Sequence, residues 1–180
     1  MKEENQKGIT LIALVVTIIV LLIIAAIGIS GGKDKIRRAN LESLKTNMML
    51  IEAKARECVE EANFKLGPNA KEIEKIGEIR QSVYENENDK SAKLEKLADL
   101  ESEFEEQGIN IPSEITSSEN EILYCVTEEA LEKWGLNKIE VEPGEVYLIK
   151  FNEVEATVEV YNNIGFNNKY SLTDISDIEL

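Results

Sequence analysis

Histidine is absent from this chain of 180 residues, which also has only three prolines, two cysteines and one tryptophan. Without histidine, a Ser-His-Asp triad, a Cys-His dyad and an imidazole metal site are all excluded. A glycine-rich phosphate loop between a strand and a helix is also missing. The carboxylates are spread over helical faces without a distinctive pair. The sequence therefore predicts a protein that is not an enzyme and that holds no metal and no cofactor.

Positive charge is scarce in the second part of the chain. Residues 1–66 hold ten Lys or Arg against eight Asp or Glu, whereas residues 67–180 hold ten against twenty-seven. The net charge of the whole chain is −15. Binding to nucleic acid needs clustered Lys and Arg to contact phosphates. We therefore expect an acidic module at 67–180 that does not bind nucleic acid.

An apolar run extends from Ile9 to Ile29, and its only polar side chains are Thr10 and Thr17. At about 1.5 Å per residue the run spans roughly 32 Å, which is the thickness of a bilayer hydrocarbon core. A secretory signal peptide has a shorter apolar core. The run therefore predicts a transmembrane helix over residues 9–30.

A short charged leader, residues 1–8, precedes this run and ends in Lys7-Gly8, directly before Ile9, Thr10 and Leu11. This arrangement resembles the leader of type IV prepilins and pseudopilins. The resemblance implies that a prepilin peptidase cuts between Gly8 and Ile9 and that the new amino terminus at Ile9 is methylated. It also implies a single-pass protein of the cell membrane with a cytoplasmic amino terminus and an extracellular head. Its partners would be the bilayer, other pilin-like subunits and the pilus or secretion assembly machinery.

Ala13 departs from the family pattern, because the fifth mature residue is usually Glu. A carboxylate in hydrocarbon is costly unless it is paired, so a Glu there suits an assembled polymer. The resemblance therefore favours a minor or atypical pilin-like protein of a type IV pilus, a competence pseudopilus or a secretion pseudopilus. One alternative stays open, namely a single-pass membrane-anchored binding or sensor module that does not polymerise.

The orientation in the membrane is contested by the basic residues around the apolar run. Only two basic residues precede the run, whereas four follow it closely: Lys33, Lys35, Arg37 and Arg38. The positive-inside rule then favours a cytoplasmic carboxyl half, opposite to the orientation that the resemblance implies. We adopt the pilin orientation, because the leader is recognised from the cytoplasm.

An amphipathic continuation of the first helix is predicted over residues 31–66. Apolar residues recur there at alternating spacings of three and four, at Leu41, Leu44, Met48, Ile51, Ala55, Cys58 and Ala62. This seam either packs against a small sheet, as in pilin-like proteins, or forms a coiled-coil oligomer. Gly28, Gly31 and Gly32 each lower helix stability by up to about 1 kcal/mol, so a bend or melted stretch is expected there.

The fold class predicted for the whole chain is α+β, with the long first helix packed on a small head at 67–180. Two stripes of apolar residues predict two helices within residues 69–107, joined by a polar loop at 85–90. Residues 122–126 read as a buried strand, and a short helix follows between the N-cap Thr127 and Gly135. Residues 146–151 and 154–161 then predict an antiparallel hairpin with one face in water.

The end of the short helix, Trp134-Gly135-Leu136, together with the closing hairpin, is similar to the heads of pilin-like proteins of Gram-positive anaerobes. Cys58 lies on the seam and Cys125 inside the first strand. After export they could pair and tie the helix to the strand. Two free, buried thiols suit both apolar positions better.

Overall fold

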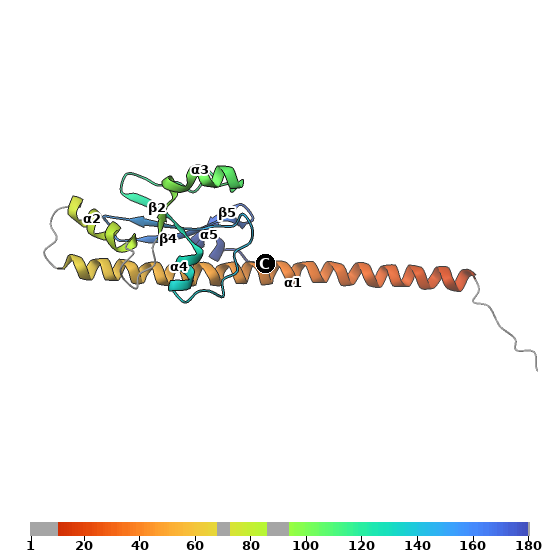
Figure 1. Cartoon of the computed structure of the whole chain (residues 1–180). Coiled ribbons are helices and arrows are strands. Elements are labelled where there is room, and N and C mark those ends of the chain that lie inside the picture. Colours follow the sequence, from red (N-terminus) through yellow and green to blue (C-terminus); the bar gives the residue numbers. More distant parts are fainter. Residues whose placement is uncertain (1–10, 68–72, 86–93, 180) are drawn as a thin grey trace, which may run out of the picture. The chain divides into compact units, whose positions relative to one another are not determined.

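The computed structural model describes residues 11–67, 73–85 and 94–179 (Figure 1). The side chains of residues 11–13, 23–32 and 73–75 lie outside this description. The chain divides into two compact units, Met1–Asn40 (unit 1) and Leu41–Leu180 (unit 2). One helix, α1 (Leu11–Leu66), contributes to both units.

Helix α1 runs without interruption through Gly28, Gly31 and Gly32. The prediction of a melted stretch at these glycines is therefore wrong. Their combined cost is spread over a helix of 56 residues, in which each added residue contributes one backbone hydrogen bond once the helix has nucleated. The helix ends at Leu66, and Gly67 follows with a φ of 65°, in agreement with the predicted stop.

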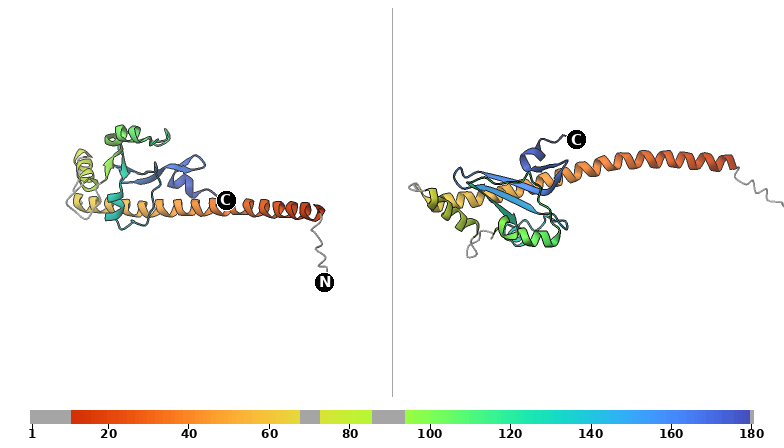
Figure 2. Two further views of the ribbon diagram at one scale, coloured as in Figure 1. Left: turned by 45° about the vertical axis from the view of Figure 1, so that its right-hand side comes forward. Right: turned by 90° about the horizontal axis from the view of Figure 1, so that it is seen from above.

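Unit 2 is built on a five-stranded antiparallel sheet, which confirms the α+β class (Figures 1 and 2). The strands follow the chain order β1-β2-β3-β4-β5, so that each pairs with its neighbours in sequence. Their bounds are Glu95–Lys96 (β1), Glu121–Val126 (β2), Tyr147–Asn152 (β3), Val158–Phe166 (β4) and Lys169–Ser171 (β5).

Four shorter helices complete unit 2: α2 (Ile73–Tyr84), α3 (Leu97–Gln107), α4 (Glu128–Lys133) and α5 (Leu172–Ser176). Helices α2 and α3 confirm the two helices predicted from the apolar stripes. The predicted N-cap is also confirmed, because the Thr127 hydroxyl accepts a hydrogen bond from the Ala130 amide at 3.1 Å. Gly135 follows α4 with a φ of 70°, a left-handed conformation that ends the helix.

The sheet is covered on both faces, so the predicted wet face is wrong. The first core lies between the seam of α1 and one face, and it contains Tyr124, Ile149 and Phe151 from the sheet. The second core lies on the opposite face, where Leu123 and Leu148 pack with Leu97 and Phe104 of α3. Successive residues of a strand point to opposite faces, and here both sets are buried.

The seam of α1 is buried inside unit 2. Met48, Ile51, Ala55 and Ala62 are completely buried in the first core, and Leu41 and Cys58 are almost so. The structure therefore supports packing of the seam against the sheet and not a coiled coil between copies.

The second strand of the hairpin begins four residues later than predicted, at Val158 instead of Val154. The side-chain oxygen of Asn152 accepts hydrogen bonds from the amides of Val154 and Glu155 at 3.0 and 2.8 Å. These bonds hold the chain in a turn, which Ala156 completes with a φ of 57°. The strands β1 and β5 and the helix α5 were not anticipated.

Candidate functional site

The predicted processing site is the bond between Gly8 and Ile9, near the amino terminus. Lys7, Gly8, Ile9 and Thr10 lie outside the described residues, as does the rest of the leader. Leu11 and Ala13 belong to the backbone of α1, but their side chains lie outside the description. Cleavage after Gly8 and methylation of Ile9 therefore stay predictions.

The described part of the apolar run forms a helical surface that unit 1 leaves uncovered. Eight large apolar side chains between Leu14 and Leu22 are each 45% to 65% exposed. The hydroxyl of Thr17 donates to the Leu14 carbonyl at 2.8 Å, so the one polar group in this stretch is satisfied by its own helix. This segment offers its surroundings an almost purely apolar face.

Within the residues that the structure describes, none of the helices has an apolar stretch long enough to cross a membrane.

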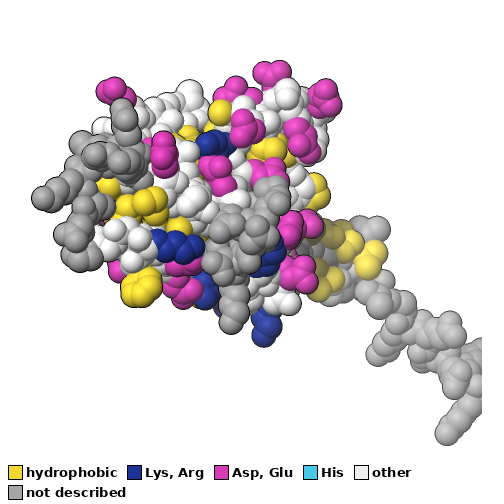
Figure 3. Space-filling model, turned by 60° about the vertical axis from the view of Figure 1, so that its left-hand side comes forward, with side chains coloured by type: hydrophobic (Ala, Val, Ile, Leu, Met, Phe, Trp, Pro, Cys, Tyr) yellow, Lys and Arg dark blue, Asp and Glu magenta, His cyan; other side chains and the backbone are white. Residues whose placement is uncertain are grey.

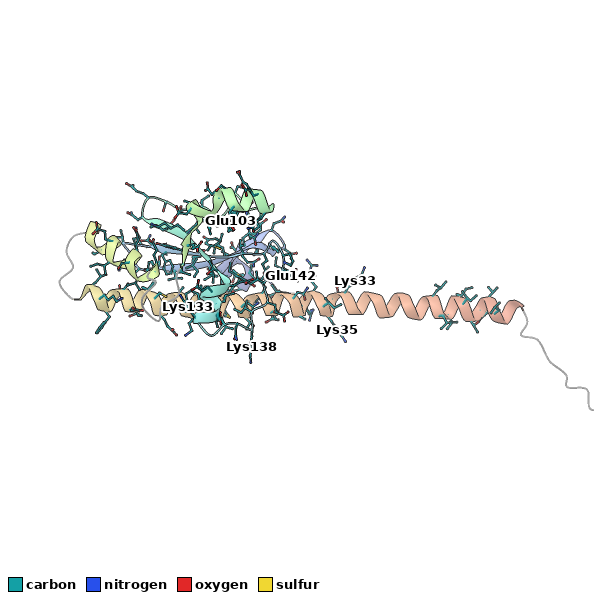
Figure 4. The ribbon with its side chains drawn as sticks, viewed as in Figure 1. Lys33, Lys35, Glu103, Lys133, Lys138 and Glu142 are labelled. Atoms are coloured by element: carbon teal, nitrogen blue, oxygen red, sulfur yellow. The ribbon has the colours of Figure 1, made fainter. Side chains whose placement is uncertain are left out.

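The basic segment, residues 33–38, follows on the same helix and is exposed to solvent. It contains the four basic residues, one acidic residue, Asp34, and one apolar side chain, Ile36, which is 63% exposed. Figure 4 marks Lys33 and Lys35, which extend from α1 in different directions. The segment is therefore a mainly basic, solvent-exposed stretch of helix, and a single exposed apolar residue within it is ordinary for a protein surface.

The two cysteines are free and buried, and they lie in different cores. Cys58 packs in the first core, between α1 and the sheet, whereas Cys125 faces the second core on the other side of the sheet. Burial, followed by nearby carboxylates, raises the pKa of each thiol from 9.0 to about 12. Both thiols are therefore protonated and poorly reactive at neutral pH.

A polar cluster of Arg80, Gln81, Asn63 and Glu153, called the clasp below, joins α2 to the rest of unit 2 and was not predicted from the sequence. The buried guanidinium of Arg80 donates to the Glu153 carbonyl and, at 3.1 Å, to the side-chain oxygen of Asn63. Gln81 donates to the Glu153 carboxylate at 2.6 Å. These contacts fix α2 against α1 and against the turn between β3 and β4, which is a structural role.

The hollows of unit 2 contain carboxylates and apolar side chains. The α3 hollow, of about 370 Å³, lies between α3 and residues 109–116, and Glu101 and Glu105 stand at its edge. The α4 hollow, of about 250 Å³, lies between α4 and residues 137–141. Across the described residues, three metal-binding side chains are nowhere grouped closely enough to hold an ion.

Comparisons of the chain with protein-family models, with curated proteins and with solved structures find no match in any of the three. Function is therefore inferred from the chain's own residues.

Proposed function

We propose that the protein is a pilin-like structural subunit. It is inserted in the membrane by the apolar segment of α1, processed after Gly8 and assembled into a filament through that same segment. The observation that carries this proposal is the exposed apolar surface between Leu14 and Leu22, which directly follows a prepilin-like leader.

The size of that surface explains why it needs a partner. Burying one fully exposed large apolar side chain is worth about 1.5 to 3 kcal/mol, so eight side chains that are about half exposed together favour burial by about 6 to 12 kcal/mol. Lipid tails and the apolar sides of neighbouring helices both supply such an environment. One surface thus serves the stored subunit in the bilayer and the assembled subunit in a filament.

The transfer between these two environments gains little hydrophobic free energy, because lipid is as apolar as a packed helix. Assembly therefore depends on helix packing and on external machinery. Unit 2 can stay folded throughout, since its own part of α1 is committed to the first core. This division suits a subunit that is stored folded and then polymerised.

Processing of the leader tests the proposal directly. In cells that contain a prepilin peptidase, mass spectrometry of the full chain is expected to find an amino terminus at Ile9, with one added methyl group. Gly8→Ala is expected to leave the leader in place. Gly31→Ala is the matched control, because it changes a glycine of the same region without touching the cleavage site.

A wild-type chain that begins at Met1 or Lys2 would contradict the proposal and favour the membrane-anchored binding or sensor module. So would normal shortening of the Gly8→Ala variant.

A further inference from the structure

The α4 hollow combines an apolar floor with an acidic edge. Leu131 and Ile139 are 3% and 8% exposed and form the floor with the partly buried Val141. The exposed carboxylates of Glu128 and Glu132 line it from α4. The segment that follows α4 adds two further exposed carboxylates, Glu140 and Glu142.

Two cations belong to the same region (Figure 4). Lys133 forms a salt bridge with Glu129 at 2.9 Å, and Lys138 is exposed. The four carboxylates of the hollow and its flank therefore outnumber the nearby positive charges. Figure 3 shows acidic side chains spread over one face of the chain, in line with the acidic composition of residues 67–180.

The shape of the α4 hollow is fixed by backbone hydrogen bonds. The amide of Leu136 donates to the Leu131 carbonyl at 2.8 Å, and the amide of Ile139 donates to the Leu136 carbonyl at 2.9 Å. At the far end the Glu142 amide donates to the Glu145 carboxylate at 2.9 Å. A partner would meet a preformed surface, which lowers the entropic cost of binding.

The position of the hollow favours a partner that approaches beside α1. Ala130, Leu131, Trp134 and Ile139 all belong to the first core, so α4 and its following segment lie on the α1 side of the sheet. The larger α3 hollow lies on the opposite side, since its Leu97 and Phe104 belong to the second core.

We propose that the α4 hollow of one copy receives the basic segment of a second copy. Ile36 covers the floor formed by Leu131, Ile139 and Val141, while Lys33, Lys35 and Arg38 face the carboxylates of the edge. This inference rests on the proposed function, because a filament assembled through α1 brings the α1 of one subunit beside the α1 face of another.

The contact joins two different surfaces, so it repeats from copy to copy and builds an open polymer instead of a closed dimer. It also gives the four basic residues a role outside the cytoplasm.

Crosslinking between full-length chains in producing cells tests the contact. One chain carries Lys35→Cys and a co-produced chain carries Asn137→Cys, which lines the hollow and is exposed. The native cysteines need no replacement, because both are buried. A short bis-maleimide is expected to yield dimers of the two chains, and a chain with both substitutions is expected to yield a ladder. Lys35→Cys with Ser113→Cys, at the α3 hollow, is the matched negative pair.

Charge reversal supplies the second readout. Glu128→Lys with Glu132→Lys is expected to lower the dimer yield about tenfold, as expected when several exposed charge pairs become repulsive. Lys33→Glu with Arg38→Glu in the second chain should restore the yield, which a merely misfolded hollow could not do. Glu101→Lys with Glu105→Lys at the α3 hollow should leave the yield unchanged.

Mass spectrometry of the amino terminus in the same samples distinguishes the proposed contact from the proposed function. Chains that begin at Ile9 but give no dimers, or dimers that ignore the charge reversal, overturn the contact and leave the proposed function intact. Charge-dependent dimers of chains that retain Met1 support the contact and count against the prepilin assignment.

Discussion

The hydroxyl of Tyr84 is predicted to cost stability, so that Tyr84→Phe should make the protein more stable. Tyr84 is 1% exposed, and among the described residues no group forms a hydrogen bond with its hydroxyl. Its ring stacks on Phe151 at 4.0 Å and meets the edge of Tyr124 at 5.9 Å. The substitution keeps both ring contacts and removes only the buried hydroxyl.

Tyr124 provides the matched control, because it lies in the same aromatic cluster but its hydroxyl is paired. It donates to the Glu85 carboxylate at 2.8 Å, and Glu85 is also bound by Lys96 at 3.0 Å. Burial first, and this hydrogen bond second, raise the pKa of Tyr124. Tyr124→Phe therefore removes a charge-assisted hydrogen bond from an otherwise equal ring.

The expected magnitudes have opposite signs. An unpaired buried hydroxyl costs about 1 to 3 kcal/mol, and after allowing for the small void left behind, Tyr84→Phe should gain about 1 kcal/mol. Loss of a hydrogen bond to a charged group costs about 1.5 kcal/mol in Tyr124→Phe. With a urea m-value of about 2 kcal/mol/M, the midpoints should move by about +0.5 M and −0.7 M.

Trp134 makes this measurable in the full chain. It is the single tryptophan and lies in the first core, so its emission reports the unfolding of unit 2 while the apolar segment stays in detergent micelles. A Tyr84→Phe midpoint that falls by as much as the Tyr124→Phe midpoint would refute the reasoning. It would mean that the Tyr84 hydroxyl is paired in solution.

Three further predictions use the same unfolding assay. Gly165→Ala should cost more than about 2 kcal/mol of stability, because φ is 62° and an added Cβ would collide with a backbone carbonyl. Gly108→Ala should cost about 1 kcal/mol, because φ is 71° but an added Cβ would meet open space. Equal losses for the two variants would contradict this reasoning. Arg80→Ala should cost about 3 kcal/mol, since it removes two hydrogen bonds from a buried charged group and leaves their partly buried acceptors unpaired. A loss below about 1 kcal/mol would show that these contacts of Arg80 are not needed. Iodoacetamide at about pH 8 should label Cys58 and Cys125 only after unfolding, because burial raises each pKa to about 12. The stabilisation from these neutral thiols is complete below about pH 9 and is lost as the pH rises towards 12. Labelling of either thiol in the folded chain would disprove its burial.

Apolar spacing of three and four residues was enough to predict the seam of α1 and the helices α2 and α3, because this spacing directly reflects which face is buried. Strand β2 was recognised as a continuous apolar run. Thr127 and Gly135 added reliable ends to α4, since each acts through local geometry. Local signals of this kind can be read without knowing the tertiary structure.

The second core could not be predicted in the same way. The apolar stripe of α3 was recognised, but not the surface it covers, because alternation in β2 and β3 is obscured when both faces are buried. Asn163 illustrates the problem, since this polar residue is 7% exposed. Its side chain bonds the Val146 amide and the carbonyls of Asn110 and Gly144, which are far away in sequence.

The processing site depended on a short motif alone, and neither the fold nor the hydrogen-bond pattern of unit 2 bears on it. The structure shows a contrast between the two parts of α1. Side chains of the described apolar stretch are exposed, whereas the seam is buried. The sequence predicted this contrast in outline, because the run from Ile9 to Ile29 is apolar on all sides whereas the seam is one stripe of an amphipathic helix.

The burial of the seam also limits how copies of the chain can associate. A coiled coil through residues 41–62 would require Leu41, Met48, Ile51 and Val59 to leave the first core, where none is more than 5% exposed. At about 1.5 to 3 kcal/mol each, their transfer to water costs about 6 to 12 kcal/mol, which is comparable to the whole stability of a domain. Copies must therefore meet through surfaces that folding leaves open. Besides the apolar segment, the surfaces left open include the basic segment and the acidic surface of residues 67–180, which carry charges of opposite sign.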